Sequence, residues 1–225
     1  GRKAKLDFSL GYGILKDYFY QSNIVDYTSA KQDNARYKLG QAKLNIERNS
    51  LNNALYPTAG NRLSLKAMGV TGNYTFSPTL NDQVTINSES KHLTWIQAEM
   101  DLENYFSLNR HLTLGTRLNI LVSTKPLLGN YTASIIQAPA FSPTPATKNY
   151  FNPAFRANSY IAAGVLPIVK LSNKFQFRTE FYAFAPFRKI IENYELKAQY
   201  DKWFRDLSYM GEASLVYNLS FASFS

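Results

Sequence analysis

The chain has 225 residues, a formal net charge of +9, no cysteine and an aromatic content of 15%. This length suffices for one large domain with its own core, the lack of cysteine excludes disulfide scaffolds and thiolate metal sites, and the aromatic content argues against disorder. Mean hydropathy is −0.30, and no run of about 18 apolar residues predicts a membrane helix. Membrane strands, by contrast, leave little trace in average hydropathy.

Apolar and polar residues alternate with a period of two along most of the chain, which indicates β-strands rather than helices. Near the N-terminus Leu6, Phe8 and Leu10 alternate with polar or small residues. Residues 160–171 form a more continuously apolar stretch that Pro167 interrupts. The same alternation continues at residues 43–47, 62–67, 94–103, 112–122, 175–183 and 211–221. The sequence therefore predicts an all-β protein.

The length of the alternating stretches favours an antiparallel transmembrane β-barrel. Several run for about ten to thirteen residues, whereas ordinary strands have about five or six and a strand tilted across a bilayer needs roughly nine to eleven. About nine or ten strands fit into the sequence by this pattern. Residues 190–204 leave two interpretations open, a strand or a short amphipathic helix.

The connections between the predicted strands differ greatly in length. Tight turns are expected at residues 107–110 and 172–174, and long connections at 16–34, 76–90 and 125–158; the last holds five of the nine prolines. In outer-membrane barrels short turns face the periplasm and long loops face outward. We therefore expect one barrel domain over residues 1–225 with long extracellular loops. Because the last strand has no obvious partner, we also expect an incomplete barrel, the C-terminal fragment of a longer protein.

Charged residues gather on the strand side opposite the apolar side. In a barrel that side lines the lumen, where opposite charges on neighbouring strands pair; in a small soluble sandwich it faces bulk water. The predicted lumen charges are Arg62, Lys66, Glu99, Asp101, Arg117, Arg178, Glu180 and Glu212.

Two enzymatic interpretations rest on pairs of residues that share a strand face. Glu99 and Asp101 would lie about 6–7 Å apart, a separation that also suits paired carboxylates of a glycosidase. His111 and Thr113 could similarly place an imidazole beside a hydroxyl. Spacing of two residues is weak evidence for either, and ion pairs with Arg and Lys on neighbouring strands explain the carboxylates more simply.

A turn motif carries a resemblance to a known superfamily. In Tyr56-Pro57-Thr58-Ala59-Gly60, Pro57 fixes φ and Gly60 can adopt a positive φ, which closes a tight turn before a strand. The motif resembles the Tyr-Pro-Thr-x-Gly-x-x-Leu turn of BamA-like surface-antigen barrels. The segments GVLPIVKLSNKFQFRTEFYAFAPF (164–187) and MGEASLVYNLSFASFS (210–225) resemble more specifically the C-terminal barrel of Bacteroidetes-type patatin-like phospholipases.

This resemblance implies a domain in the outer membrane of a Gram-negative bacterium that anchors or assists a periplasmic lipid hydrolase encoded upstream. Patatin-like hydrolysis needs a Gly-x-Ser-x-Gly elbow, which the sequence lacks, so we assign the segment no catalytic residue, cofactor or metal. BamA-like barrels also carry Val-Arg-Gly-Phe/Tyr on a lumen loop, and residues 155–158 keep only its arginine. Arg156 is the candidate loop anchor, expected to pair with Glu99, Asp101 or Glu180.

The positive charge bears on the expected partners. Lys and Arg are scattered along strands and loops rather than massed with aromatic residues on one platform, which argues against nucleic acid and favours anionic lipid head groups. We expect membrane lipids, an upstream hydrolase domain and a second copy of the chain as partners. Two alternatives stay open: a BamA-like assembly or translocation factor or channel, and a soluble β-sandwich binding module.

Overall fold

A computed structural model describes residues 4–20, 32–78, 88–172, 174–218 and 223–224 and confirms the all-β prediction. The main sheet has nine strands in the order β1-β2-β3-β4-β5-β6-β7-β10-β11, and every neighbouring pair is antiparallel. The strands are β1 (Lys5–Phe19), β2 (Asp33–Asn49), β3 (Gly60–Ser77), β4 (Glu89–Ser107), β5 (Leu112–Ser123), β6 (Tyr160–Lys170), β7 (Phe175–Pro186), β10 (Ser208–Asn218) and β11 (Ser223–Phe224).

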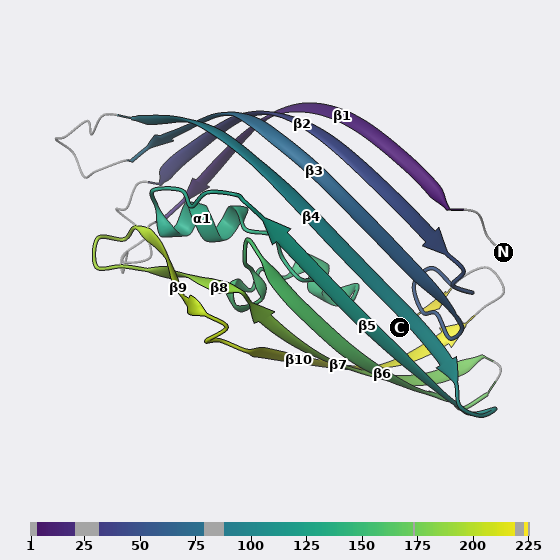
Figure 1. Cartoon of the computed structure of the whole chain (residues 1–225). Helices are drawn as coiled ribbons and strands as arrows, with labels where there is room; N and C mark the ends of the chain where they lie inside the picture. Colours follow the sequence, from purple (N-terminus) through teal and green to yellow (C-terminus); the bar gives the residue numbers. More distant parts are fainter. Residues whose placement is uncertain (1–3, 21–31, 79–87, 173, 219–222, 225) are drawn as a thin grey trace.

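The sheet is strongly curved, and its two faces differ in what covers them. Figure 1 shows β1 to β4 arching over helix α1 (Tyr131–Gln137), which lies on the concave side. Side chains of alternate residues point to opposite faces, so Leu10 on β1 and Ile96 on β4 point outward and are 73% and 64% exposed. The convex face is therefore apolar and uncovered in the described part of the chain.

The core lies on the concave side, beneath the connection between β5 and β6. This connection contains α1 and two short 3-10 helices, η1 (Ala146–Asn149) and η2 (Pro153–Phe155). Near α1, Leu128 and Ala133 join a buried cluster with residues of β2 to β4. Near η2, Phe141 and Phe155 pack on residues of β6 and β7. The proline-rich connection is thus a folded layer over the sheet.

The chain between β7 and β10 settles the ambiguous segment 190–204. It contains a separate antiparallel hairpin of β8 (Arg188–Glu192) and β9 (Ala198–Trp203), so the helical interpretation is wrong. Leu196 adopts a φ of 59° in the hairpin turn, a conformation that a regular right-handed helix does not contain. Ile190 is buried against Ile135 and Ala138 of the β5–β6 connection.

The edges of the sheet bear on two predictions, the position of the last strand and the incomplete barrel. The predicted last strand at 211–221 corresponds to β10, and residues 219–221 lie outside the described residues. The described strands leave β1 at one edge and β11 at the other, so the sheet is open as far as it is described. In the same residues we find no helix with both the length and the apolar character to span a membrane.

Candidate functional site

The predicted lumen charges of β3 and β4 face one another on the concave side. The antiparallel register places Lys66 opposite Glu99 and Arg62 opposite Glu103. Lys66 Nζ lies 3.2 Å from Glu99 Oε2, and Arg62 Nη2 lies 3.3 Å from Glu103 Oε2. Glu103 is not among the predicted lumen charges, although it follows Asp101 by two residues and therefore shares its face.

Asp101 connects these pairs to β5. Arg62 Nη2 lies 2.6 Å from Asp101 Oδ2, while Arg117 donates from Nε to Oδ1 and from Nη2 to Oδ2, each at 3.1 Å. Asp101 is 5% exposed, so two guanidinium groups compensate one buried carboxylate. We call Arg62, Lys66, Glu99, Asp101, Glu103 and Arg117 the ion-pair cluster.

The ion-pair cluster also bears on the glycosidase interpretation of Glu99 and Asp101. Glu99 contacts Lys66 and accepts a hydrogen bond from Asn119 Nδ2 at 3.2 Å. Both carboxylates therefore face donors on neighbouring strands. Neither lies in an apolar pocket of the kind that surrounds the general acid of a glycosidase, so the arrangement is that of structural ion pairs.

Arg117 joins the sheet to the folded layer. Its Nη1 donates to the carbonyl oxygen of Pro143, in the β5–β6 connection, at 2.8 Å. One side chain thus binds both the ion-pair cluster and the layer above it. This is the loop-anchoring role that the resemblance to BamA-like barrels implies for Arg156.

Arg156 has different partners from those expected. Its Nη1 donates to the carbonyl oxygens of Ile136 and Ala138 at 2.8 and 2.9 Å, and its guanidinium lies 4.6 Å from the ring centre of Phe151. Burial lowers the pKa of Arg156. The expected pairing with Glu99, Asp101 or Glu180 is wrong. The β5–β6 connection folds back on itself, so that its own carbonyl oxygens bind the guanidinium.

The predicted turn motif meets Arg178 of β7. Arg178 is 1% exposed and donates from Nη1 to the carbonyl oxygen of Pro57 at 2.8 Å. Its guanidinium carbon also lies 5.7 Å from the ring centre of Tyr56 and 5.9 Å from that of Tyr105, within the range of a cation–π contact. We call Tyr56, Pro57, Tyr105 and Arg178 the turn lock.

Gly60 closes the turn as predicted. Its φ is +95°, a region that residues with a Cβ rarely occupy. A Cβ at this position would lie 2.2 Å from the carbonyl oxygen of Ser50. Asn52 supports the turn by accepting hydrogen bonds from the backbone N–H groups of Thr58 and Ala59.

Glu180 and Glu212 occupy directly opposite positions on β7 and β10. Glu180 accepts a hydrogen bond of 2.5 Å from the Tyr182 hydroxyl, and its Oε1 lies 3.5 Å from Arg178 Nε. The eight predicted lumen charges therefore share the concave face. Five of them belong to the ion-pair cluster on β3 to β5, and the other three, Arg178, Glu180 and Glu212, lie on β7 and β10.

The predicted pair of His111 and Thr113 does not assemble a reactive site. Thr113 is completely buried on the concave side, whereas His111 sits in the exposed turn before β5, where its Nδ1 lies 3.4 Å from the carbonyl oxygen of Lys170. Within the described ranges, no three His, Asp or Glu side chains gather as metal ligands do. The chain matches no family model, no curated protein and no solved structure.

Proposed function

We propose that this chain forms part of the wall of a transmembrane β-barrel in the outer membrane of a Gram-negative bacterium, and that it serves as a non-catalytic anchor. Its convex face would contact lipid, and its concave face would line the interior. The polarity of the two faces carries the proposal. A soluble β-sandwich packs its apolar face against a second layer, whereas here the folded layer and the ion pairs lie on the opposite, concave face.

The apolar side chains of the convex face form a band of limited width, which supports this proposal. On β1 the band runs from Leu6 to Ile14, and the next outward residue is Lys16. Its neighbour on β2 is Arg36, and Lys38 is also exposed. A strand crosses the hydrocarbon core in roughly nine to eleven residues, and Lys and Arg at its border would meet lipid head groups.

The unequal connections give further support. Short connections between β4 and β5 and between β6 and β7 lie at one end of the sheet, whereas the described part of the other end holds the β5–β6 connection and the β8–β9 hairpin. Outer-membrane barrels have short turns on the periplasmic side and long loops on the outer side. The turn lock would then face the periplasm and the β8–β9 hairpin the exterior.

The periplasmic partner in this proposal is a lipid hydrolase domain upstream of the chain. Its support is the resemblance of segments 164–187 and 210–225 to patatin-like phospholipase barrels. Genomic sequence that places a Gly-x-Ser-x-Gly elbow in the same reading frame before Gly1 would support this role. An upstream segment of another class would instead favour a role in assembly, translocation or transport.

Lipid contact can be tested residue by residue, because the chain contains no cysteine. Ile96→Cys and Gln97→Cys introduce labelling sites at adjacent positions of β4 whose side chains point to opposite faces. Each variant of the full protein would be labelled with a small fluorophore and reconstituted into vesicles that contain spin-labelled lipid.

We expect strong quenching of the label at position 96 and little at position 97. Leu10→Cys and Gly11→Cys repeat the comparison on β1. Equal quenching at both positions of each pair would overturn the proposal, as would a protein that remains monodisperse without detergent.

A further inference from the structure

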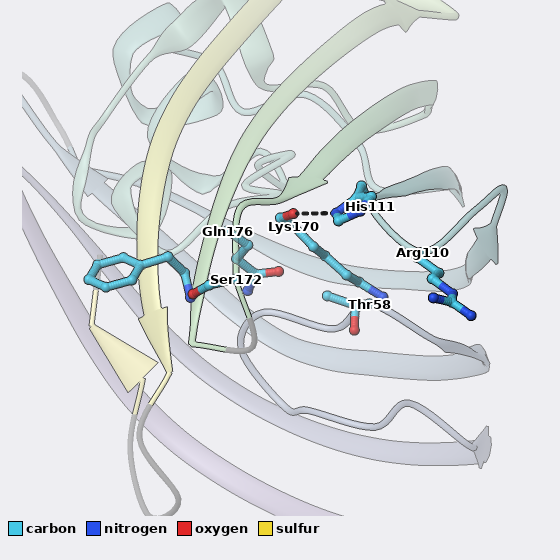
Figure 2. Close-up of a pocket in the computed structure, with 7 residues that line it drawn as sticks. Thr58, Arg110, His111, Lys170, Ser172 and Gln176 are labelled. Carbon is cyan, nitrogen blue, oxygen red and sulfur yellow. Dashed lines mark hydrogen bonds between the residues drawn. The ribbon is translucent and has the colours of Figure 1, made fainter.

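A polar pocket of about 420 Å³ lies at the end of the sheet where the short turns gather. Figure 2 shows the side chains around it: Thr58 before β3, Arg110 and His111 before β5, Lys170 at the end of β6, and Ser172 just after that strand. Phe175 and Gln176 of β7 complete the wall. Since Gln176 lies on the concave side, the pocket belongs to the mouth of the concave face and not to the apolar convex face.

The charged groups of this pocket, Arg110 and Lys170, are cationic. Within the described residues, neither Arg110 nor Lys170 takes part in an ion pair. The turns that carry them are well defined: Asn109 Oδ1 accepts from the backbone N–H of His111 at 2.8 Å, and Lys170 N–H donates to the His111 carbonyl oxygen at 2.7 Å. The pocket therefore presents two positive charges on ordered backbone.

Gln176 supplies an independent observation. Its side chain is 2% exposed, and its Nε2 has no hydrogen-bond partner among the described residues. A buried amide without a partner is unfavourable, so such groups are usually satisfied by a ligand or by solvent. Gln176 lies in the pocket wall beside Lys170 (Figure 2), so it adds a polar side chain to the two cations.

We propose that this pocket binds a phosphate group, carried either by a small water-soluble ester or by a lipid head group. Phosphate oxygens accept strong charge-assisted hydrogen bonds from Arg and Lys. The hydroxyls of Thr58 and Ser172 add neutral donors around the same space. The inference does not depend on the membrane proposal, because the pocket and its charges exist in either environment.

Titration calorimetry of the intact, detergent-solubilised protein tests the proposal, with inorganic phosphate, glycerol 3-phosphate and a short-chain phosphatidic acid as probes. Binding of the water-soluble probes would identify a free phosphate or ester as the source. Binding of phosphatidic acid alone would identify a lipid head group. No saturable binding of any probe would overturn the proposal.

Variants then locate the binding. Arg110→Gln and Lys170→Gln should each weaken binding by at least about tenfold, which is the effect of losing one charged hydrogen bond. Lys174→Gln is the matched control, because Lys174 lies in the β6–β7 turn and is exposed but does not line the pocket. We expect it to change affinity less than twofold, and a loss equal to that of Lys170→Gln would overturn the pocket as the site.

Gln176→Leu removes the polar amide from the pocket wall and tests whether it contributes to binding. It should weaken phosphate binding while leaving the tryptophan emission of the folded protein unchanged. If this buried variant fails to fold, Arg110→Gln decides the matter, because Arg110 lies in an exposed turn. Unchanged affinity in Arg110→Gln would contradict the proposal.

Discussion

Arg178 and Pro57 are 121 residues apart in sequence, yet Arg178 Nη1 donates a 2.8 Å hydrogen bond to the Pro57 carbonyl oxygen. The bond joins β7 to the turn before β3, two elements that are not neighbours in the sheet. It therefore spans the concave face rather than following the strand ladder. A buried guanidinium in this position fixes the distance between the two halves of the curved sheet.

Replacing Arg178 should consequently destabilise the protein more than replacing a cation of the ion-pair cluster. Arg178→Met leaves the Pro57 carbonyl without its donor and Glu180 without its ion-pair partner, and we expect a loss of about 3–5 kcal/mol in the free energy of unfolding. Arg178→Lys should lose less stability than Arg178→Met, because it keeps the positive charge. It should still be less stable than the unchanged protein, because lysine lacks the planar guanidinium group. Urea unfolding in detergent, followed by tryptophan fluorescence, measures both.

Lys66→Met is the control for Arg178→Met. The Lys66 and Glu99 side chains are 35% and 21% exposed, and partly solvated pairs contribute less than about 1 kcal/mol. Equal losses in Lys66→Met and Arg178→Met would show that the turn lock does not join the two halves of the sheet.

Gly60 and Gly69 give a second comparison within one strand. Gly60→Ala should cost at least about 1 kcal/mol, because it forces a Cβ into a positive-φ position and against the Ser50 carbonyl oxygen. Gly69→Ala meets no atom within 4 Å and should leave the stability unchanged or slightly higher. The same unfolding experiment distinguishes them, and a neutral Gly60→Ala would refute the tight-turn geometry.

Arg117 is expected to hold the β5–β6 connection against the concave face of the sheet. Arg117→Met removes the hydrogen bond to Pro143, so the β5–β6 connection should open more often and trypsin should cleave after the exposed Lys148 about tenfold faster. Arg62→Met is the matched control, because Arg62 binds the same Asp101 but no residue of that connection. Equal acceleration in both variants would mean that the cluster, not the Pro143 bond, holds the layer.

Local patterns in the sequence predicted the strands and their faces, because alternation depends only on neighbouring residues. The positive φ of Gly60 was predictable for the same reason. The hydrogen-bond partners of Arg156 and Arg178 could not be predicted, since they are backbone carbonyls that only the folded chain brings close to these side chains. Helix α1 escaped prediction because it is one short segment within a proline-rich connection. The phosphate pocket was missed because its residues come from separate turns, although those turns share one end of the sheet.

Lys125 provides a pH-dependent test of the folded layer. Its Nζ donates to the Gln137 carbonyl oxygen at 2.6 Å and lies 5.2 Å from the ring centre of Trp95. Burial lowers the pKa of Lys125 to about 8, and the nearby Asp17 partly opposes this shift. The folded protein therefore binds fewer protons than the unfolded chain between the folded pKa and the usual lysine value near 10.4.

The sign follows from proton linkage: where the unfolded chain binds more protons, stability rises with pH. Between pH 8 and 9.5 the free energy of unfolding should increase by about 1–2 kcal/mol. Lys125→Met should abolish that increase. In a Trp203→Phe background, the emission of Trp95 should also titrate with a midpoint near pH 8, because Lys125 loses its charge beside the indole. A Trp95 signal that titrates equally in Lys125→Met would assign the change to another group.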